Sequence, residues 1–318
     1  MKAFFKLKGA LGLNIPKVDS CLHIFDHTIK PILLYGSEVW GTYNIDPMKD
    51  QRDNSFEIEK KYSKLDGEIL CLKFYKYILG VHKKSCNIAV VGELGRTPLY
   101  VDVIYFLLKY FDRIKNMEDS HLLKQGLFTS MKIHEGNGSS WFSVIEKILK
   151  CLNISIDNFD LSTVKNILID RYMRFWKHSL VDNACNKKGK LCTYFDFKNI
   201  FKKESYLSQV KNFNHRMCMS KFRISFHNLA IERDRYKKID KKNRICLICW
   251  DSKTVEDEYH FLMECPLYSN EREKVFVTSI SNCANFSDLS EKNLYGYFQM
   301  NVNRSIYLFP NLLVRVLK

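Results

Sequence analysis

The sequence predicts a mostly α-helical protein built from helical bundle modules, with a small knuckle near the C-terminus. Three observations support this fold class. Apolar residues recur at intervals of three and four in several long segments, which is the period of a helix with one buried face. No run of alternating apolar and polar residues longer than four indicates a strand. Of the 318 residues, 46% are hydrophobic, which is typical of a globular protein with a substantial core.

The first two predicted helices lie in the N-terminal half of the chain. One spans residues 58–79 and ends at Gly80, because glycine accepts the left-handed backbone that often terminates a helix. The next begins beside Pro98, where the missing N–H of proline costs least. The apolar stripe of this second helix consists of Leu99, Val103, Phe106, Leu107, Tyr110 and Ile114.

The later predicted helices show the same periodicity. Residues 161–176 follow a polar start at Asp160, and residues 215–236 also have helical spacing. A last helix is expected at residues 302–317, with an interruption at Pro310. The stripe within residues 161–176 consists of Leu161, Val164, Leu168, Tyr172, Phe175 and Trp176.

Three polar segments predict boundaries between parts of the chain. They are residues 46–55, residues 134–140 with the sequence HEGNGSS, and the charged run at residues 237–244. We therefore expect four consecutive parts. These are a helical region at residues 1–135, a helical middle region that ends in a basic helix at 136–236, a basic linker with a knuckle at 237–270, and C-terminal helices at 271–318.

The chain is strongly basic, with a formal net charge of +15 and a sequence pI near 9.2. Such a balance favours a polyanionic partner, and nucleic acid before an anionic membrane. The alternative interpretation is a lysine-rich surface that is simply solvated.

Nothing in the sequence indicates a membrane span or a secretory signal. The longest apolar runs are far shorter than the roughly 20 residues that cross a bilayer. Lysines interrupt the first residues, where a signal peptide would need an apolar core. Eleven cysteines, mostly scattered, suit a reducing compartment better than a disulfide framework. We expect an intracellular protein, in the nucleus or the cytoplasm, with no membrane partner.

Four residues near the C-terminus have the spacing of a metal site. Two residues separate Cys246 from Cys249, ten separate Cys249 from His260, and four separate His260 from Cys265. Three thiolates and an imidazole suit zinc, and four protein ligands leave no coordination position for a reacting water. The pattern therefore predicts a structural zinc ion in a CCHC knuckle, as opposed to a chance grouping of cysteines and histidine.

A catalytic zinc of the deaminase type does not fit this pattern. That site needs a His-x-Glu motif and a Pro-Cys-x-x-Cys motif, in which the glutamate is not a ligand. Here the order is Cys265-Pro266, and Glu264 lies between two ligands.

Residues 205–245 concentrate positive charge directly before the knuckle. Eleven basic residues, Lys211 among them, against three acidic ones leave a net charge of +8. Such a cluster binds phosphate without reading base sequence. The residues predicted to contact nucleic acid are Arg216, Lys221, Arg223, Arg233, Arg235, Lys237, Lys238, Lys241, Lys242 and Arg244.

Aromatic residues are interleaved with these basic residues. Phe213, Phe222, Phe226 and Tyr236 could stack on unpaired bases, although helical spacing favours a place in the core. The knuckle itself has five acidic residues and only Lys253 as a basic one. We therefore expect the zinc unit to position the basic helix and not to bind phosphate itself.

Several phrases of the sequence are similar to the region after the palm in non-LTR (LINE-type) retrotransposon reverse transcriptases. They are IKPILLYGSEVWG at residues 29–41, YILGVHKK at 77–84, VGELGRTPL at 91–99, FRIS at 222–225, RIC at 244–246, DEYHF at 257–261 and CP at 265–266. The resemblance covers roughly residues 10 to 275. Where that family often has Gly-Arg before the basic run, this chain has Asp234-Arg235.

The resemblance implies a thumb-like region at residues 1–135 followed by a zinc-knuckle tail. Such polymerases hold two magnesium ions on paired palm aspartates, and this sequence contains no Asp-Asp pair. We therefore expect a C-terminal fragment of such a protein that lacks the fingers, palm and endonuclease, and that is not itself an enzyme.

Two functions of different kinds follow from these features. The first is non-catalytic binding of RNA or target DNA by a zinc-braced basic helix. The second is a zinc-containing scaffold that binds protein, or a retroelement relic without a selected role.

Overall fold

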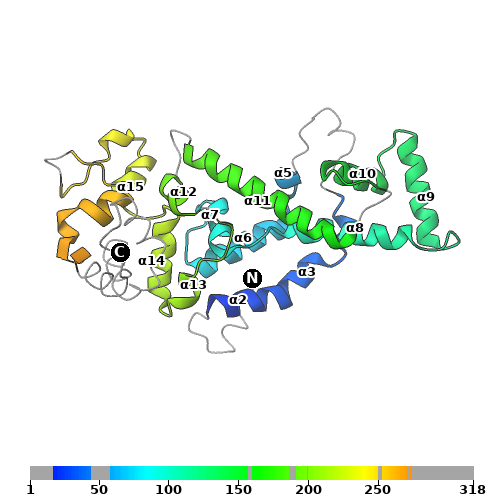
Figure 1. The fold of residues 1–318 in the computed structure, drawn as a ribbon, viewed down its shortest axis with the longest axis horizontal. Helices are drawn as coiled ribbons and strands as arrows, with labels where there is room; N and C mark the ends of the chain where they lie inside the picture. Colours follow the sequence, from blue (N-terminus) through cyan, green and yellow to red (C-terminus); the bar gives the residue numbers. More distant parts are fainter. Residues whose placement is uncertain are drawn as a thin grey trace. The chain divides into compact units, whose positions relative to one another are not determined.

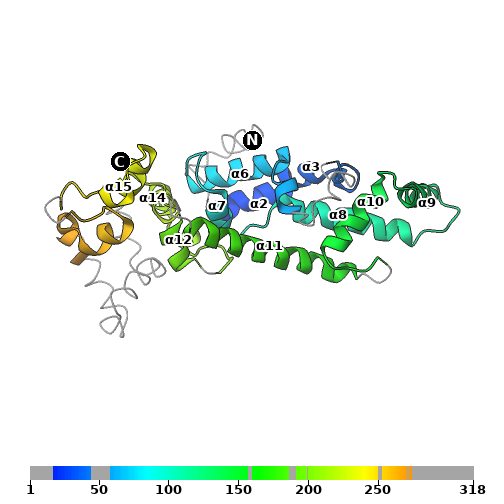
Figure 2. The ribbon, with the colours of Figure 1, turned by 90° about the horizontal axis from the view of Figure 1, so that it is seen from above.

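The structure is a computed structural model that is mostly helical (Figures 1 and 2), which confirms the predicted fold class. Among the residues that it describes, the only pairing of extended backbone is one antiparallel bridge between Ile245 and Val255. The helix expected at residues 302–317 and the polar segment at 46–55 lie outside the described residues. The structure describes residues 17–43, 58–156, 160–185, 191–198, 200–249, 253–270 and 272–273.

The chain divides into two compact units, each assembled from separate segments of sequence. The first unit comprises residues 1–22, 72–96 and 177–318, and the second comprises residues 23–71 and 97–176. The four consecutive domains expected from the sequence stay a prediction. Three helices contribute residues to both units: α2 (Val18–Ile24), α6 (Asp66–Leu79) and α11 (Leu161–Cys185).

The second unit contains the helix that the sequence predicted beside Pro98, which is α8 (Leu99–Lys115). Its other helices are η1 (Phe25–Ile29), α3 (Lys30–Leu34), α4 (Ser37–Trp40), α5 (Ile58–Tyr62), α9 (Leu122–Glu135) and α10 (Trp141–Cys151). Helix α4 packs on α8. Helices α9 and α10 pack on each other and on α8 (Figure 1). In its core the ring of Tyr100 lies 5.8 Å from that of Tyr62 and 6.2 Å from that of Tyr172.

The first unit contains the knuckle and the basic segment. Its helices are α7 (Asn87–Leu94), α12 (Cys192–Phe197), α13 (Tyr206–Gln209), α14 (Phe213–Arg223), α15 (Ala230–Tyr236), η3 (Lys241–Asn243), η5 (His260–Glu264) and η6 (Pro266–Tyr268). Most of these elements are a single turn or two. They depend on tertiary packing, because isolated helices this short are not stable in water.

A buried ion network joins α7 to α14 within the first unit. The guanidinium of Arg223 donates to both carboxylate oxygens of Glu93, at 2.9 and 3.1 Å, and pairs with Glu204 at 2.9 Å. The hydroxyl of Tyr206 also donates to Glu93, at 2.7 Å. Removing one partner of such a buried pair leaves an uncompensated charge, which typically costs about 3 to 5 kcal/mol.

The helix predicted at residues 58–79 is in fact two helices. Helix α5 ends at Tyr62 and α6 begins at Asp66, with a turn at residues 63–65 between them. The predicted end at Gly80 is confirmed, since Gly80 has a φ of 66° and Val81 donates back to the carbonyl of Lys76 at 3.0 Å.

The basic helix predicted at residues 215–236 is also divided. Helix α14 ends where Ser225 adopts a φ of 53° and Phe226 donates to the carbonyl of Lys221 at 2.7 Å. This is the usual helix-ending motif, here with serine in the position that glycine commonly takes. Helix α15 then starts at Ala230, so the expectation of one continuous basic helix is corrected to two short helices.

The stripes predicted for the two long helices are largely confirmed. Within α8, Val103, Leu107 and Ile114 are buried, but Phe106 and Tyr110 are only half-buried. The neighbouring residues Ile104, Leu108 and Phe111 are buried as well, so the apolar face is wider than predicted. Within α11 the buried residues of the predicted stripe are Val164, Leu168, Tyr172 and Trp176.

Candidate metal centre

Cys246, Cys249, His260 and Cys265 converge in the structure as the spacing predicted. Their ligand atoms all lie within 4.8 Å of one another, so this group could hold a metal ion. The Sγ atoms of Cys249 and Cys265 are 3.9 Å apart. A tetrahedron with metal–sulfur bonds of about 2.3 Å has edges of about 3.8 Å. The arrangement therefore has the size of a four-coordinate site.

The first two ligands lie on a turn that extended backbone holds in place. The single bridge pairs Ile245 with Val255, and the N–H of Cys246 donates to the carbonyl of Thr254 at 2.9 Å. These two interactions close the chain on itself around the first cysteine. Cys246 is buried as a result, whereas Cys249 is half-buried.

The other two ligands lie at the two ends of η5. The carboxylate of Asp257 accepts the N–H of His260 at 2.8 Å and so caps the start of this turn. At its end, the N–H of Cys265 donates to the carbonyl of His260 at 2.8 Å. Arg272 donates to the carbonyls of Leu262 and Cys265, at 2.7 and 2.8 Å. His260 and Cys265 are thereby fixed relative to each other.

The imidazole of His260 shows which of its nitrogens is available to a metal. Its Nδ1 lies 3.1 Å from a carboxylate oxygen of Glu264, whereas its Nε2 is buried and has no hydrogen-bond partner. An unpartnered buried nitrogen is costly in a folded protein. A metal ion bound at Nε2 would remove that cost. Glu264 would then orient the ring through Nδ1, as carboxylates that hydrogen-bond to metal-ligating histidines commonly do. The residues present therefore fit a metal.

Two of the three thiols must lose a proton before they can bind a metal ion. Burial raises the pKa of Cys265 to about 12, with the neighbouring Cys246 and Cys249 contributing in the same direction. Burial likewise raises the pKa of Cys249. A thiol with a raised pKa stays protonated at neutral pH unless a metal ion displaces the proton. Metal binding at this site should therefore release protons.

The knuckle is joined to α14 and α12 inside the first unit. The ring of Phe261 lies 5.7 Å from that of Phe222. His227, which follows α14, is within 2.9 Å of a carboxylate oxygen of the buried Glu258, and Thr193 of α12 donates to the other oxygen at 3.0 Å. Although burial opposes it, the hydrogen bond from His227 lowers the pKa of Glu258. The knuckle is therefore an integral part of the first unit.

Arg244 and Glu256 link the metal centre to α15 and to the loop after it. The guanidinium of Arg244 donates to the carbonyl of Ile231 at 2.8 Å and twice to that of Ile239, at 3.0 and 2.9 Å. The carboxylate of Glu256 accepts the N–H of Ala230 at 2.7 Å, at the first residue of α15. The position of the basic loop is thus set by residues on either side of the bridge that holds Cys246.

Two of the ten residues predicted to contact nucleic acid are buried, which corrects that part of the prediction. Arg216 and Arg223 are each 5% exposed. The guanidinium of Arg216 donates to the carbonyls of Val210 and Lys211, at 2.8 and 3.0 Å, and Arg223 is part of the buried ion network with Glu93. Both guanidinium groups are buried and make hydrogen bonds within the protein, so they cannot contribute to an exposed basic surface.

Three further residues of that set are half-buried. They are Lys221, Arg235 and Arg244. Arg235 pairs with Glu232 at 3.0 Å, and Arg244 is engaged with backbone carbonyls as described. We therefore assign Arg244 a structural role that the sequence did not indicate.

The exposed residues of the ten predicted to contact nucleic acid lie on α15 and in the loop that follows it. Lys238, Lys241 and Lys242 are exposed, with no ion pair to another described residue. Arg233 and Lys237 are also exposed but share Asp234 as a partner, at 3.2 and 3.1 Å. We call these five residues, Arg233, Lys237, Lys238, Lys241 and Lys242, the lysine surface.

The four aromatic residues of the basic segment differ in exposure. Phe222 is buried, as the sequence analysis favoured. Phe213 and Phe226 are half-buried, and the ring of Phe226 stacks on that of His82 with centroids 5.3 Å apart. Tyr236 is 62% exposed, which is contrary to a place in the core.

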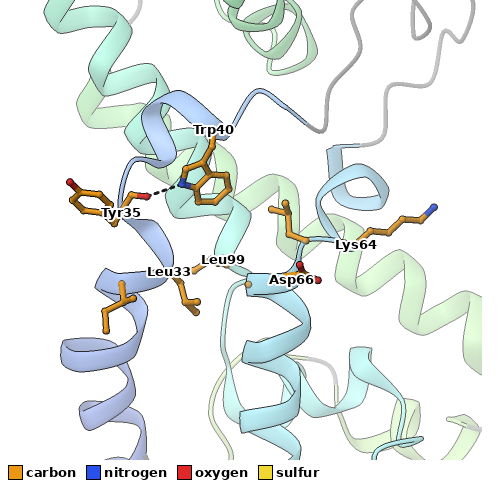
Figure 3. A pocket seen from close by; sticks show the side chains of 9 residues that line it. Leu33, Tyr35, Trp40, Lys64, Asp66 and Leu99 are labelled. Atoms are coloured by element: carbon orange, nitrogen blue, oxygen red, sulfur yellow. Dashed lines mark hydrogen bonds between the residues drawn. The ribbon is translucent and has the colours of Figure 1, made fainter. Parts of the chain in front are cut away.

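A separate cavity of about 490 Å³ lies in the second unit (Figure 3). Trp40 borders it and donates its ring N–H to the carbonyl of Tyr35 at 2.8 Å. Its charged lining residues are Lys64 and Asp66, and Leu33 and Leu99 add apolar surface. No residue that the sequence singled out for metal or nucleic acid lines this cavity.

Among the described residues, no helix combines the length and the apolar character that crossing a bilayer requires.

No protein-family model, no curated protein and no solved structure matches the chain. The similarity of its phrases to reverse transcriptases therefore stays a prediction from the sequence.

Sequence reasoning found the four ligands but missed the residues that hold them. Glu264 is four residues after His260, a spacing that places two side chains on the same face of a helical turn. That signal was present in the sequence. Asp257 three residues before His260 was a similar capping signal. The contacts of Arg244 and Glu256 had no such local signal, because their partners lie 13 and 26 positions away.

Proposed function

We propose that this chain binds RNA or DNA without catalysis, through the lysine surface, and that a structural zinc ion holds this surface in place. The observation that carries the proposal is the position of the exposed lysines. Lys238, Lys241 and Lys242 lie on backbone that is tied by Arg244 to the segment that carries Cys246. Clustered cations that make no ion pair with another described residue are available to phosphate oxygens.

Zinc is the metal that we propose for the centre. Three thiolates and one imidazole are a common zinc ligand set, and tetrahedral geometry requires no open position. Zinc also has no redox chemistry, which suits a structural role. When bound, it would neutralise the thiolates and link the turn at Cys246 and Cys249 to η5. Thiol ligands must stay reduced, which supports an intracellular location in the nucleus or cytoplasm.

The resemblance to non-LTR retrotransposon reverse transcriptases supports nucleic acid as the partner. On this proposal the chain corresponds to the thumb-like and zinc-knuckle part of such a protein. The chain would then hold RNA or target DNA and would not copy it.

A salt series with the purified, zinc-loaded chain tests the proposal. The ligands are a labelled RNA and a nicked DNA duplex. Substituting Lys237, Lys238, Lys241 and Lys242 together by alanine should weaken binding to both. For duplex DNA the slope of log K against log salt should shrink by about three to four, because each phosphate contact contributes about 0.9.

The matched control removes four exposed lysines elsewhere, Lys73, Lys84, Lys109 and Lys132, and so changes the net charge equally. It should leave the slope nearly unchanged. If the control weakens binding as much as the lysine-surface variant, net charge alone explains the affinity and the proposed surface is wrong. If the folded, zinc-loaded chain binds neither ligand at low salt, nucleic-acid binding is ruled out and a protein-binding scaffold or a relic remains.

A protein-binding scaffold is the second candidate, and exposed apolar residues on the knuckle favour it. Leu247 and Ile248, between the first two cysteines, are 74% and 50% exposed, and Leu267 is 54% exposed. Exposed apolar residues on a small motif can form a protein contact. A complex that survives nuclease and high salt, and is lost in a Leu247→Ser variant, would support this candidate over the first.

A further inference from the structure

Tyr236 is the one aromatic residue among the four of the basic segment that presents most of its side chain to solvent. It is 62% exposed, whereas Phe222 is 4% exposed and lies against Phe261 of the knuckle. An exposed tyrosine contributes little to stability, because its ring gains little from burial. Because Tyr236 lies among cationic residues in the sequence, we consider a role in ligand binding instead.

In the sequence Tyr236 lies between two residues of the lysine surface, Arg233 and Lys237. It is the last residue of α15, one turn after Arg233 and directly before Lys237. Residues three apart lie on the same side of a helix, so Arg233 and Tyr236 share a face. Lys238 then takes a left-handed φ of 60°, which turns the chain so that the remaining lysines follow in the next loop.

The ring of Tyr236 is also held before any ligand binds. The guanidinium of Arg235 lies over it, 5.3 Å from the ring centroid. Arg235 is in turn anchored by its ion pair with Glu232, at 3.0 Å, and Glu232 is buried. Because part of the side-chain entropy is already lost, a ligand that contacts the ring loses less free energy in ordering it.

We infer that Tyr236 stacks on an unpaired base, so that the lysine surface prefers single-stranded nucleic acid to duplex. The inference rests on the proposed function and adds the class of ligand. In a duplex both faces of each base are covered by its neighbours, whereas an unpaired base can expose a face to an aromatic ring. Phosphates on either side of that base would then meet Arg233 and Lys237.

Comparing an unstructured single strand with a duplex of equal length tests the inference, using the full zinc-loaded chain. Tyr236→Ala should weaken binding to the single strand by roughly 5- to 150-fold, which is the range measured for loss of one stacking contact. It should change duplex binding by less than about twofold. Tyr236→Phe, which keeps the ring, should bind both ligands as the unmodified chain does.

Two further variants separate this inference from the proposed function. Tyr43→Ala removes a tyrosine that is 81% exposed outside the basic segment, and it should bind as the unmodified chain does. The quadruple lysine variant should weaken binding to both ligands. If it does so while Tyr236→Ala has no effect, or lowers both affinities equally, the stacking inference is wrong and the lysine surface stands. If the unmodified chain binds neither ligand, both are overturned.

Discussion

Glu264 accepts a hydrogen bond from the ring of His260 and leaves the other ring nitrogen free for a metal. It is half-exposed, so its substitution should not disturb the core. We predict that Glu264→Ala lowers the zinc affinity of the full chain about 10- to 100-fold, the usual cost of losing such a partner. Glu264→Gln, whose amide oxygen can still accept the hydrogen bond, should lose less. Competition with a chromophoric chelator measures both.

The exposed Glu273 provides the control for this prediction. Glu273→Ala changes the charge near the site by the same amount without touching His260. An equal loss of zinc affinity in Glu273→Ala would mean that net charge near the metal matters and that the hydrogen bond does not.

Glu68 is a second residue whose environment has a measurable consequence. It lies in the first turn of α6, and its carboxylate accepts the N–H of Leu99 at 2.7 Å. Burial raises the pKa of Glu68 to about 7, against the opposing effects of that hydrogen bond and of Lys30. Between pH 4.5 and 7 the folded state therefore holds a proton that the unfolded chain has released, and the free energy of unfolding falls as the pH rises.

We predict from this that Glu68→Gln is stabilised relative to the unmodified chain as the pH rises. The glutamine keeps an oxygen for Leu99 and carries no charge. The two proteins should have similar stability near pH 4.5, and the variant should be more stable by roughly 3 kcal/mol at pH 8. Urea unfolding at several pH values measures the difference. A difference that does not change with pH would show that the carboxyl is not protonated in the fold.

At the scale of single elements, the ends of helices explain where the sequence was informative. Gly80 and Gly95 have φ values of 66° and 59° and end α6 and α7, and a glycine in this position is easily recognised. Ser225 and Lys238 do the same for α14 and α15, with φ values of 53° and 60°. Nothing in those side chains indicates a left-handed backbone, which is why the division of residues 215–236 was not predicted.

This chain has Asp234-Arg235 where the retrotransposon family often has Gly-Arg, and the local structure explains why no glycine is needed there. Both residues lie within α15, and neither needs the freedom of glycine. The turn is made by Lys238, since Ile239 donates to the carbonyl of Asp234 at 3.1 Å. Charge and turn are therefore combined in one lysine.

Two glycines give opposite predictions when each is changed to alanine. A Cβ at Gly95 would collide with the backbone of Lys202 and Lys203 and would require a left-handed alanine. We expect Gly95→Ala to lower stability by more than about 2 kcal/mol. Gly126 lies inside α9 with open space around it, so Gly126→Ala should raise stability by roughly 0.5 to 1 kcal/mol. Thermal unfolding measures both, and a neutral Gly95→Ala would contradict the close approach.

At the scale of the whole molecule, the two units should respond differently to loss of the metal. Only the first unit contains the centre at Cys246. Binding energy at such a site is also folding energy, so a chelator should loosen the loop that Arg244 holds. We predict faster trypsin cleavage at residues 237–244 after chelation, with residues 97–156 of the second unit still protected, as measured by mass spectrometry of the fragments.

Restoring zinc should restore protection of that loop. Simultaneous cleavage of both units after chelation would contradict the prediction, because it would mean that the metal stabilises the whole chain and not the first unit.

The limits of sequence reasoning also belong to this scale. The metal ligands were predictable because Cys246 to Cys265 are close in sequence and their spacing has a chemical meaning. The burial of Arg223 in an ion pair was not predictable, since its partner Glu93 is 130 positions earlier in the sequence. An arginine two residues after Lys221 in a basic segment looks like part of a phosphate-binding surface until the buried carboxylate opposite it is known. The helical fold class could be predicted from local periodicity alone. Which of the basic residues are exposed could be seen only in the tertiary structure.

The pairing of Glu93 with Arg223 has a consequence for the order in which the two units fold during synthesis. A ribosome that adds about 5 to 20 residues per second makes the guanidinium roughly 6 to 26 s after the carboxylate. During that interval α7 emerges with a charge that has no buried partner, so it cannot take its final place. The second unit is complete once Trp176 has been made. The unit whose first residues are translated earliest is therefore the last to close.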